Sequence, residues 1–553
     1  MGTAERSDSK GPTAEATLLV ENARIRTLDE RGTVAESLAA MGDRIIAVGS
    51  NKELAGLAGR ATERLDLEGR TVLPGFIDAH EHLSSFAEMF LQVDLSPDRV
   101  RSLSELAEVI RSEAERLPEG EWIRGILYDD TKMEEQRLLT RDDLDRVAPR
   151  HPVIVSHVSL HWGIANSEAL RRGGLDETSP DPEGGRLGRD PATGRLTGQL
   201  IEAAFFRFAD QAMSGEPVVV PPFDRGVRRR ALVEAAKVLN SAGLTSVVDA
   251  LVSSSYVTSY LDTARERSLP LRVNMLLSYF LLHDLEGLGL LGGWGNELVR
   301  STGIKVILDG AIAGRTAAFG DGYADNPEDH GVLVIEDQGF LNELVERIHR
   351  LGYQACLHAN GDVAIEMALD AIGRAEEIFP RPDPRHRIEH CTVINERILE
   401  RMGLLGVLAV PFGSYLWQHG EKLIPYYGRE RVETMFAHRS FLEKGIRVAG
   451  SSDHPCGLHP PLLGVQTMVT RQTKTGEVVG SWQKISIEEA FKMYTSHAAY
   501  ASFEEDVKGS LTVGRLSDMV VLEEDPWDVL PGEIGEIGVT MTILGGRVVY
   551  RSL

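Results

Sequence analysis

The stretch LPGFIDAHEHLSS, residues 73–85, closes a short apolar run with two histidines, His80 and His82. In a β-strand, side chains two residues apart point to the same face, so these two imidazoles are able to hold one ion together. The alternative is a pair of ordinary polar residues at a strand end, and the motif alone does not choose between the two. Partners elsewhere in the chain, and their order, decide the question.

Length, charge and cysteine content set the class of protein. The chain has 553 residues and a net charge of −24. That length suits a barrel with accessory domains, and that charge repels nucleic acid and anionic membranes, so we expect neither as a partner. Three cysteines (Cys356, Cys391 and Cys456) favour a reducing compartment, which predicts a cytoplasmic protein. The polar residues 1–16 lack the apolar core of a secretion signal and predict a flexible tail.

The order of apolar patterns predicts an α/β protein built around a TIM barrel. Residues 17–70 and 508–553 alternate apolar and polar positions, and we expect them to form one β-sandwich domain from both termini. Residues 71–91 with 225–507 alternate short β-branched runs with amphipathic segments, which predicts a (β/α)8 barrel. Residues 92–224 are too long for one connection and are predicted to be an inserted subdomain after the first barrel strand. The expected barrel strands are 71–80, 244–249, 271–277, 303–309, 353–359, 386–392, 406–411 and 446–452.

One charged residue lies inside an apolar predicted strand, and another lies at the end of one. Lys305 lies inside GIKVILDG, residues 303–310, where a lysine is costly unless it is paired or used chemically. Either it pairs with a carboxylate such as Asp309, or CO2 carboxylates it into an anionic ligand able to bridge two metals. Asp453 ends the apolar run IRVAGSSD and is either a functional carboxylate or a turn or helix cap.

Two further histidines, His358 and His390, lie near the ends of the runs YQACLHANG and HRIEHCTV. Each is either a metal ligand or a hydrogen-bonded core histidine. The order of all the candidates is more specific than any one of them: His-x-His on the first strand, lysine on the fourth, histidine on the fifth and sixth, and aspartate on the eighth. All lie at or near carboxyl ends of strands, where such barrels carry their active sites. The set therefore indicates one metal site.

At this point the chain resembles the amidohydrolase superfamily, and within it amidohydrolase family 3, the YtcJ-like hydrolases. The resemblance runs from about residue 17 to the end and includes VSLHWGIANS in the insertion. It implies a distorted (β/α)8 barrel with one or two divalent metals, best matched by zinc (Zn2+). The implied metal ligands are His80, His82, His358, His390, Asp453 and, if N6-carboxylated, Lys305. The motifs that carry the resemblance are LPGFIDAHEH, GLTSVVDA, GIKVILDGAIAGRTAAF, HANGDVAI, HRIEHCTVI, AGSSDHP, KGSLTVGRLSDMVVLEEDP and ILGGRVVY.

The resemblance also implies a reaction, the hydrolysis of a non-peptide C–N bond in a small-molecule amide. Zinc lowers the pKa of its water to ~7, and Asp453 would act as the acid and base that moves the proton to the departing nitrogen. One activity described in this branch converts N-substituted formamides to amine and formate, and it is the substrate class we expect. Hydrolytic deamination and the cleavage of cyclic amides or carbamates are the alternatives within the same superfamily.

Two residues are candidates for binding the substrate. His161 matches a histidine in the insertion of the family, and Arg315 follows the strand that carries Lys305 and is placed to clamp a polar group. For both, the alternative is a structural hydrogen bond. The resemblance further suggests a homo-oligomer such as a homodimer.

Overall fold

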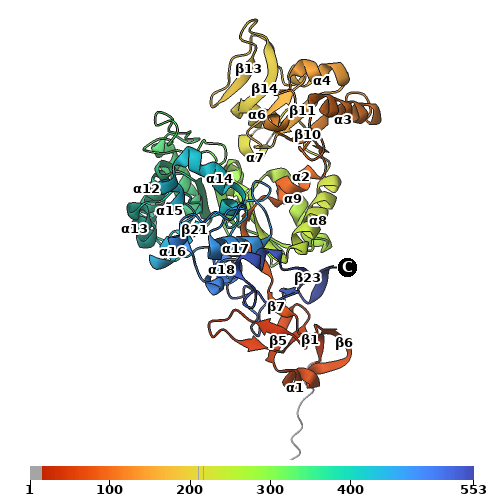
Figure 1. The fold of residues 1–553 in the computed structure, drawn as a ribbon, viewed down its shortest axis with the longest axis vertical. Coiled ribbons are helices and arrows are strands. Elements are labelled where there is room, and N and C mark those ends of the chain that lie inside the picture. Colours follow the sequence, from red (N-terminus) through yellow and green to blue (C-terminus); the bar gives the residue numbers. More distant parts are fainter. Residues whose placement is uncertain (1–14, 210, 216, 553) are drawn as a thin grey trace, which may run out of the picture.

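The computed structural model describes residues 15–209, 211–215 and 217–552 (Figure 1). Most of the predicted tail, residues 1–16, lies outside the described residues, and β1 (Ala16–Glu21) begins at its last position. In Figure 1 the chain forms three regions in a row, with a barrel between the sheets of the chain ends below and the sheet of the inserted segment above. Among the described residues, no helix has both the length and the apolar character needed to cross a membrane.

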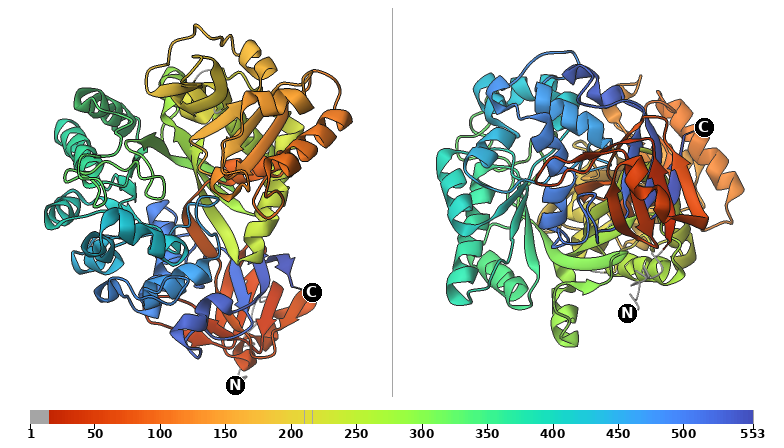
Figure 2. Two further views of the ribbon diagram at one scale, coloured as in Figure 1. Left: turned by 45° about the horizontal axis from the view of Figure 1, so that its top comes forward. Right: turned by 90° about the horizontal axis from the view of Figure 1, so that it is seen from below.

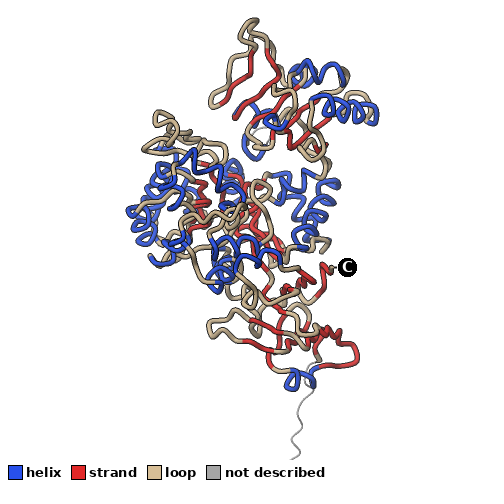
Figure 3. The backbone as a smooth tube through the Cα atoms, in the orientation of Figure 1, coloured by secondary structure: helices blue, strands red, loops and turns tan. Residues whose placement is uncertain are grey.

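A parallel sheet forms the wall of the barrel, in the order β21-β20-β19-β18-β16-β15-β8. Each strand pairs in parallel with the next, and the intervening helices lie outside the strands (Figures 2 and 3). The strands are β8 (Phe76–Glu81), β15 (Leu244–Val252), β16 (Arg272–Ser278), β18 (Val299–Ile307), β19 (Gln354–Ala359), β20 (Arg387–His390) and β21 (Leu408–Val410). The helices between them are α8 (Arg225–Ser241), α9 (Ser254–Glu266), α10 (Leu282–Leu288), α11 (Gln338–Arg350), α12 (Asp362–Ile378) and α13 (Glu396–Leu405).

The helices begin where the sequence supplies a capping side chain. Asp224, Asp337 and Asn395 accept backbone N–H groups of the first turns of α8, α11 and α13. Such caps satisfy donors that have no partner within the helix. At the other end of α13, Gly406 takes the left-handed conformation with φ +63°, which glycine adopts without a Cβ clash. Each helix therefore turns back onto the sheet at a defined residue, and this places the strand ends at one rim.

The first expected strand, 71–80, is divided in the structure. Its first part is β7 (Thr71–Pro74), which pairs with strands from the chain ends, whereas β8 belongs to the barrel. The break falls at Gly75, where a Cβ would lie 2.3 Å from the side chain of Thr245. Only glycine permits this close approach, so the chain passes from one sheet to the other at this position.

The expected eighth strand, 446–452, is not a regular strand. It makes single bridges to β21 and its extension, at Val448 and Ser451, while Gly450 accepts a hydrogen bond from Ala79 of β8. The Tyr494 ring lies 3.0 Å from the position that a Cβ at Gly450 would take. The ring therefore occupies the space in which a regular strand would place a side chain. The barrel is therefore nearly closed, and 446–452 bridges its first and last regular strands.

Strands from both ends of the chain share a sheet. Its order is β24-β23-β22-β7-β2-β3, and a second sheet has the order β5-β4-β1-β6. The apolar side chains between them form one cluster that includes Leu18, Ile25, Leu38, Val521 and Ile543. The boundaries of a sandwich domain at 17–70 and 508–553 stay a prediction. The strands are β2 (Arg24–Arg26), β3 (Val34–Ala35), β4 (Ser37–Met41), β5 (Arg44–Gly49), β6 (Ala58–Asp66), β22 (Met519–Leu522), β23 (Val539–Leu544) and β24 (Arg547–Arg551).

The segment between β8 and β15 carries its own sheet, in the order β13-β14-β12-β11-β10-β9. It packs a separate apolar cluster under α3 (Leu103–Arg116) and α4 (Arg141–Val147). The boundaries 92–224 of an inserted subdomain remain a prediction. The strands are β9 (Val93–Asp94), β10 (Ile123–Tyr128), β11 (Val153–His157), β12 (Trp162–Ala165), β13 (Gly185–Arg189) and β14 (Leu196–Glu202).

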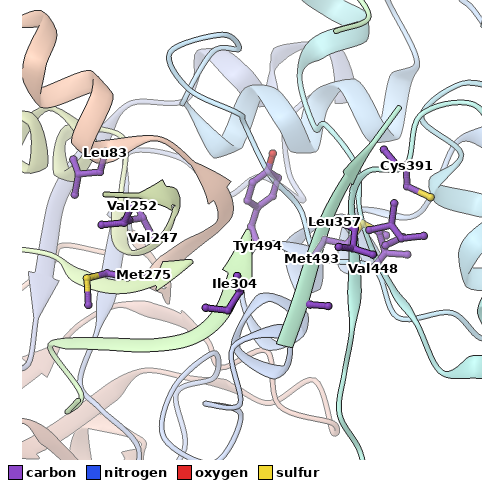
Figure 4. Packing of buried hydrophobic residues seen from close by; sticks show 14 of the residues in the cluster. Leu83, Val247, Val252, Met275, Ile304, Leu357, Cys391, Val448, Met493 and Tyr494 are labelled. Carbon is purple, nitrogen blue, oxygen red and sulfur yellow. The ribbon is translucent and has the colours of Figure 1, made fainter. Parts of the chain in front are cut away.

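The barrel core is continuous between the strands and the helices that cover them. Strand residues such as Ile304 and Leu357 and helix residues such as Met493 are fully buried in it. Figure 4 shows part of this cluster, with the Tyr494 ring in its middle and the buried Cys391 at one side. Dense packing of this kind holds the strand ends rigidly, which is what a precisely arranged site at the rim requires.

Candidate active site

His80, in β8, and His82, directly after that strand, present the same ring nitrogen to one point. The Nδ1 atom of His80 is hydrogen-bonded to Glu389, and that of His82 lies 3.0 Å from the carbonyl oxygen of Ala250. A carboxylate and a carbonyl only accept hydrogen bonds, so both Nδ1 atoms are the donors, and in the neutral rings the lone pairs lie on Nε2. The Nε2 atoms lie 3.5 Å and 3.1 Å from Oδ1 of Asp453. These three side chains form a group whose ligand atoms lie within 4.8 Å of one another.

Lys305 is buried beside this group. Its Nζ lies 3.3 Å from Nε2 of His80, and only 1% of the residue is exposed. Burial lowers the pKa of Lys305 to about 8, against the opposing effect of the Glu389 and Asp453 carboxylates. The pairing of Lys305 with Asp309 that the sequence left open is not found among the described residues. The Asp309 carboxylate instead accepts backbone N–H groups of the loops at 318 and 360–361.

His390 and His358 complete the cluster. The His390 ring stacks on Phe412 with centroids 4.5 Å apart, and its edge faces the rings of His358 and His80 at 4.5 Å and 4.8 Å. On His358, Nε2 lies between the Gly310 carbonyl oxygen and the Asn360 side chain. The Nδ1 atom of His390 is buried and has no hydrogen-bond partner among the described residues.

The electrostatics leave imidazole lone pairs available. Burial, followed by the charge of Lys305, lowers the pKa of His358 to about 3. Burial likewise places the pKa values of His80 and His390 well below the usual range. For His82 burial works in the same direction, but the hydrogen bond that its ring donates to Asp453, together with the charge of that carboxylate, outweighs burial and raises the pKa. Burial therefore favours the neutral ring, the form that coordinates a metal, for His80, His358 and His390.

The donor set fits a divalent metal. Imidazole nitrogens and a carboxylate oxygen are the ligands that zinc and similar ions take in proteins. The orphaned Nδ1 of His390 and the close approach of Asp453 to two Nε2 atoms are both accounted for by a cation held between them. The structure therefore brings all six predicted residues to one end of the barrel, and their individual assignment as ligands stays a prediction.

One important residue was missed from the sequence, Glu389. It is fully buried, binds His80 and is itself held by Arg387, whose Nη2 lies 2.8 Å from Glu389 Oε2 and also binds the carbonyl of Ala79. A signal was present in HRIEH, because Arg387 and Glu389 stand two apart on one face of an apolar strand. A buried ion pair at that spacing indicates a polar partner inside the barrel.

The two substrate-binding candidates are placed differently. Arg315 forms an ion pair with Asp325 at 2.8 Å and its guanidinium lies over the rings of Tyr323 and Tyr426. Within the described residues it has no contact with the histidine cluster. His161 is bonded to Glu202 in the inserted segment, and its charge is among the causes that lower the pKa of His358. Whether either residue binds substrate stays a prediction.

A parallel barrel with clustered histidines, a buried lysine and an aspartate at one rim defines a class of hydrolases, and comparison with known proteins identifies the family. The amidohydrolase family model matches residues 63–550, so the chain belongs to the amidohydrolase family. It is accordingly a hydrolase that acts on carbon–nitrogen bonds.

Several relatives match nearly the whole chain. An N-substituted formamide deformylase from Arthrobacter pascens is 32% identical over 97% of this chain and 98% of its own. The putative amidohydrolase YtcJ of Bacillus subtilis is 30% identical over 95% of this chain and 98% of its own. The crystal structure of an uncharacterized metal-dependent hydrolase from Pyrococcus furiosus superimposes with a TM-score of 0.73, at 26% identity, over 92% of this chain and 99% of that one.

Proposed function

We propose that the protein is a metal-dependent amidohydrolase that converts an N-substituted formamide to an amine and formate. The observation that carries the metal-dependent reaction is the convergence of the His80 and His82 Nε2 atoms on Asp453 Oδ1, with Lys305 at 3.3 Å from the first of them. Support for the formamide comes from the relative in Arthrobacter pascens, which aligns over 97% of this chain.

The residues that would hold the ion are the four histidines and Asp453. When bound, a divalent ion such as zinc supplies an acidified water and a positive charge beside the substrate carbonyl. Glu389 and the Ala250 carbonyl hold the Nδ1 atoms of His80 and His82, which would leave the Nε2 atoms for coordination. The remaining chemistry belongs to the protein's own side chains.

Asp453 is the residue we propose for the proton transfer. Its Oδ1 lies 3.1 Å from Nε2 of His82, within the histidine cluster. We assign it the removal of a proton from the attacking water and the delivery of that proton to the departing nitrogen. The reaction consumes one amide and one water molecule and produces one amine and one formate.

Lys305 is the candidate for carboxylation. Its amine is buried at 1% exposure and, among the described residues, is hydrogen-bonded only to His80. Reaction with CO2 would replace a cation by a carbamate anion, which favours a second metal beside the first. Carboxylated Lys305 thus predicts two ions, and an unmodified lysine predicts one.

The test measures formate, amine and ammonia separately with purified, zinc-loaded protein. N-Benzylformamide is compared with N-benzylacetamide, a cyclic amide, a carbamate and an amino-substituted heterocycle. Equimolar formate and benzylamine, with formamides the fastest substrates, support the proposal. Ammonia from the heterocycle without formate from the formamide would replace it by hydrolytic deamination.

A further inference from the structure

His161, directly before β12, and Glu202, the last residue of β14, form a hydrogen-bonded pair at the end of two neighbouring inner strands of the inserted sheet. The Nδ1 atom of His161 lies 3.0 Å and 3.2 Å from the two carboxylate oxygens of Glu202. The backbone N–H of Glu202 also donates to the carbonyl oxygen of His161, at 2.8 Å. Main chain and side chain together therefore hold the imidazole at a set orientation.

Two residues at the pair have a backbone conformation that is unfavourable for residues with a side chain. Leu160, directly before His161, has φ +59°, and Glu202 itself has φ +49°. The left-handed region is disfavoured for residues with a side chain, because Cβ approaches the following carbonyl. The fold thus maintains two strained residues at the place where the histidine and the carboxylate meet, and such strain concentrates at functional sites.

The inserted segment is seated on the rim of the barrel beside the candidate metal site. Glu202 leads through α6 (Ala203–Ala209) into α7 (Gln211–Ser214), where the carbonyl of Ala212 accepts a hydrogen bond of 2.8 Å from Ser278. Ser278 is the last residue of β16, and its register partner in β18 is Lys305. The pair therefore lies at the end of the inserted sheet that continues through α6 and α7 to the strand ends beside Lys305.

Hydrogen bonding determines what the His161 ring offers to a ligand. An ionised carboxylate accepts only, so Nδ1 of His161 is the donor in the contact with Glu202. In the neutral ring this leaves a lone pair on Nε2, which accepts a hydrogen bond. About a third of each side chain is exposed (35% for His161 and 37% for Glu202), so a ligand has access to the ring.

We propose that His161, held by Glu202, accepts the N–H of the scissile amide and so selects N-monosubstituted over N,N-disubstituted substrates. His161 is then a specificity residue, and Glu202 is a positioning residue that acts through it. The inference rests on the proposed amide hydrolysis but adds a requirement on the substrate nitrogen. A site built around an acceptor loses that hydrogen bond when the nitrogen carries a methyl group in place of its proton.

The test compares N-benzylformamide with N-benzyl-N-methylformamide through the ratio of their kcat/KM values. Both substrates are assayed on the same preparation, so any loss of folded protein cancels from the ratio. We expect His161→Ala to reduce the preference for the N–H substrate about tenfold, mainly through KM for that substrate. Glu202→Ala should act in the same direction, and Glu202→Gln, which keeps an accepting oxygen, should retain most of the preference.

Matched controls are His283→Ala and Glu183→Ala, both at exposed positions, which should leave the ratio at its wild-type value. A wild-type enzyme without the preference, or a His161→Ala ratio equal to that of the wild type, overturns the inference. If acetamides or carbamates prove to be faster substrates than formamides, the formamide proposal fails. The same ratio, measured on their N–H and N-methyl forms, then still decides the part played by His161.

Discussion

Glu389 binds the Nδ1 atom of His80, although the two residues are 309 positions apart in the chain. Arg387 holds the carboxylate from the other side, and all three side chains are fully buried. The contact determines which nitrogen of His80 faces Asp453 and Lys305. A carboxylate behind a histidine ligand also makes the ligand more basic and restricts ring rotation.

Removing this contact should weaken metal binding directly. We expect Glu389→Ala to lower zinc affinity about 10- to 100-fold, because the His80 ring loses the acceptor that orients it. Glu389→Gln keeps an accepting oxygen and should lose less. The measurement is zinc retention during competition with a chelator, which is independent of turnover. Glu346→Gln is the matched control, since Glu346 lies on α11 away from the histidine cluster and bonds Arg350 of the same helix. Wild-type zinc affinity in Glu389→Ala would contradict the assigned orientation of His80.

Replacing Asp453 should reduce turnover but leave the metal bound. We expect Asp453→Asn to lower kcat by about 10²- to 10⁴-fold, because an amide does not accept and return the proton. Zinc should remain bound, since the histidines supply the other ligands. Zinc content and kcat are measured on the same sample. A variant with zinc and near wild-type kcat would remove Asp453 from the proton transfer.

The state of Lys305 can be tested by reconstitution. Metal-stripped protein is reloaded with zinc in CO2-free buffer and, in parallel, in bicarbonate. If the amine is carboxylated, activity should return fully only with bicarbonate, and the native mass should increase by one CO2 per chain. Equal recovery in both buffers at an unchanged mass would show a plain lysine and a site for one ion.

A buried histidine pair away from the active site should make the stability of the fold depend on pH. His386 accepts the Ala355 N–H at Nδ1, so its Nε2 donates to Nδ1 of His349 at 2.8 Å, and His349 Nε2 donates to the Phe379 carbonyl. Burial, then the charges of His349 and Arg381, lower the pKa of His386 to about 3. Every lone pair and proton of the two rings is used, which leaves no free nitrogen for a metal.

The sign of the effect follows from proton uptake. Between pH ~6.5 and about 3 the unfolded chain binds a proton at His386 that the folded chain does not, so stability falls as pH falls. The slope from this one group is at most about 1.4 kcal/mol per pH unit. We expect His386→Gln, which cannot titrate, to show a smaller drop in thermal midpoint between pH 7 and pH 5 than the wild type. An equal drop in both would contradict this, and exposed His283→Gln serves as the control.

Local patterns in the sequence predicted the barrel and brought the six candidates to one end of it. Strand period and apolar runs are properties of neighbouring residues, and parallel strands align their carboxyl ends, so Lys305, His358 and His390 could be placed together without a structure. The hydrogen-bond partners of the site residues could not be predicted from the sequence. Glu389 meets His80, and Glu202 meets His161, only after distant segments have folded.

The irregular eighth strand has a similar cause. The run IRVAGSSD has the composition of a strand, but the Tyr494 ring packed against Gly450 comes from a helical region some forty positions later. Contacts of this kind override local propensity. The same holds for Gly75, whose close neighbour Thr245 is far away in the sequence.

Zinc content measured together with turnover tests the central claim most directly. We predict about one to two zinc ions per chain in purified protein, loss of C–N bond hydrolysis when the metal is stripped, and its return when zinc is restored. His80→Ala should lose both the metal and the turnover. Full activity in wild-type protein with far less than one metal ion per chain would contradict the account.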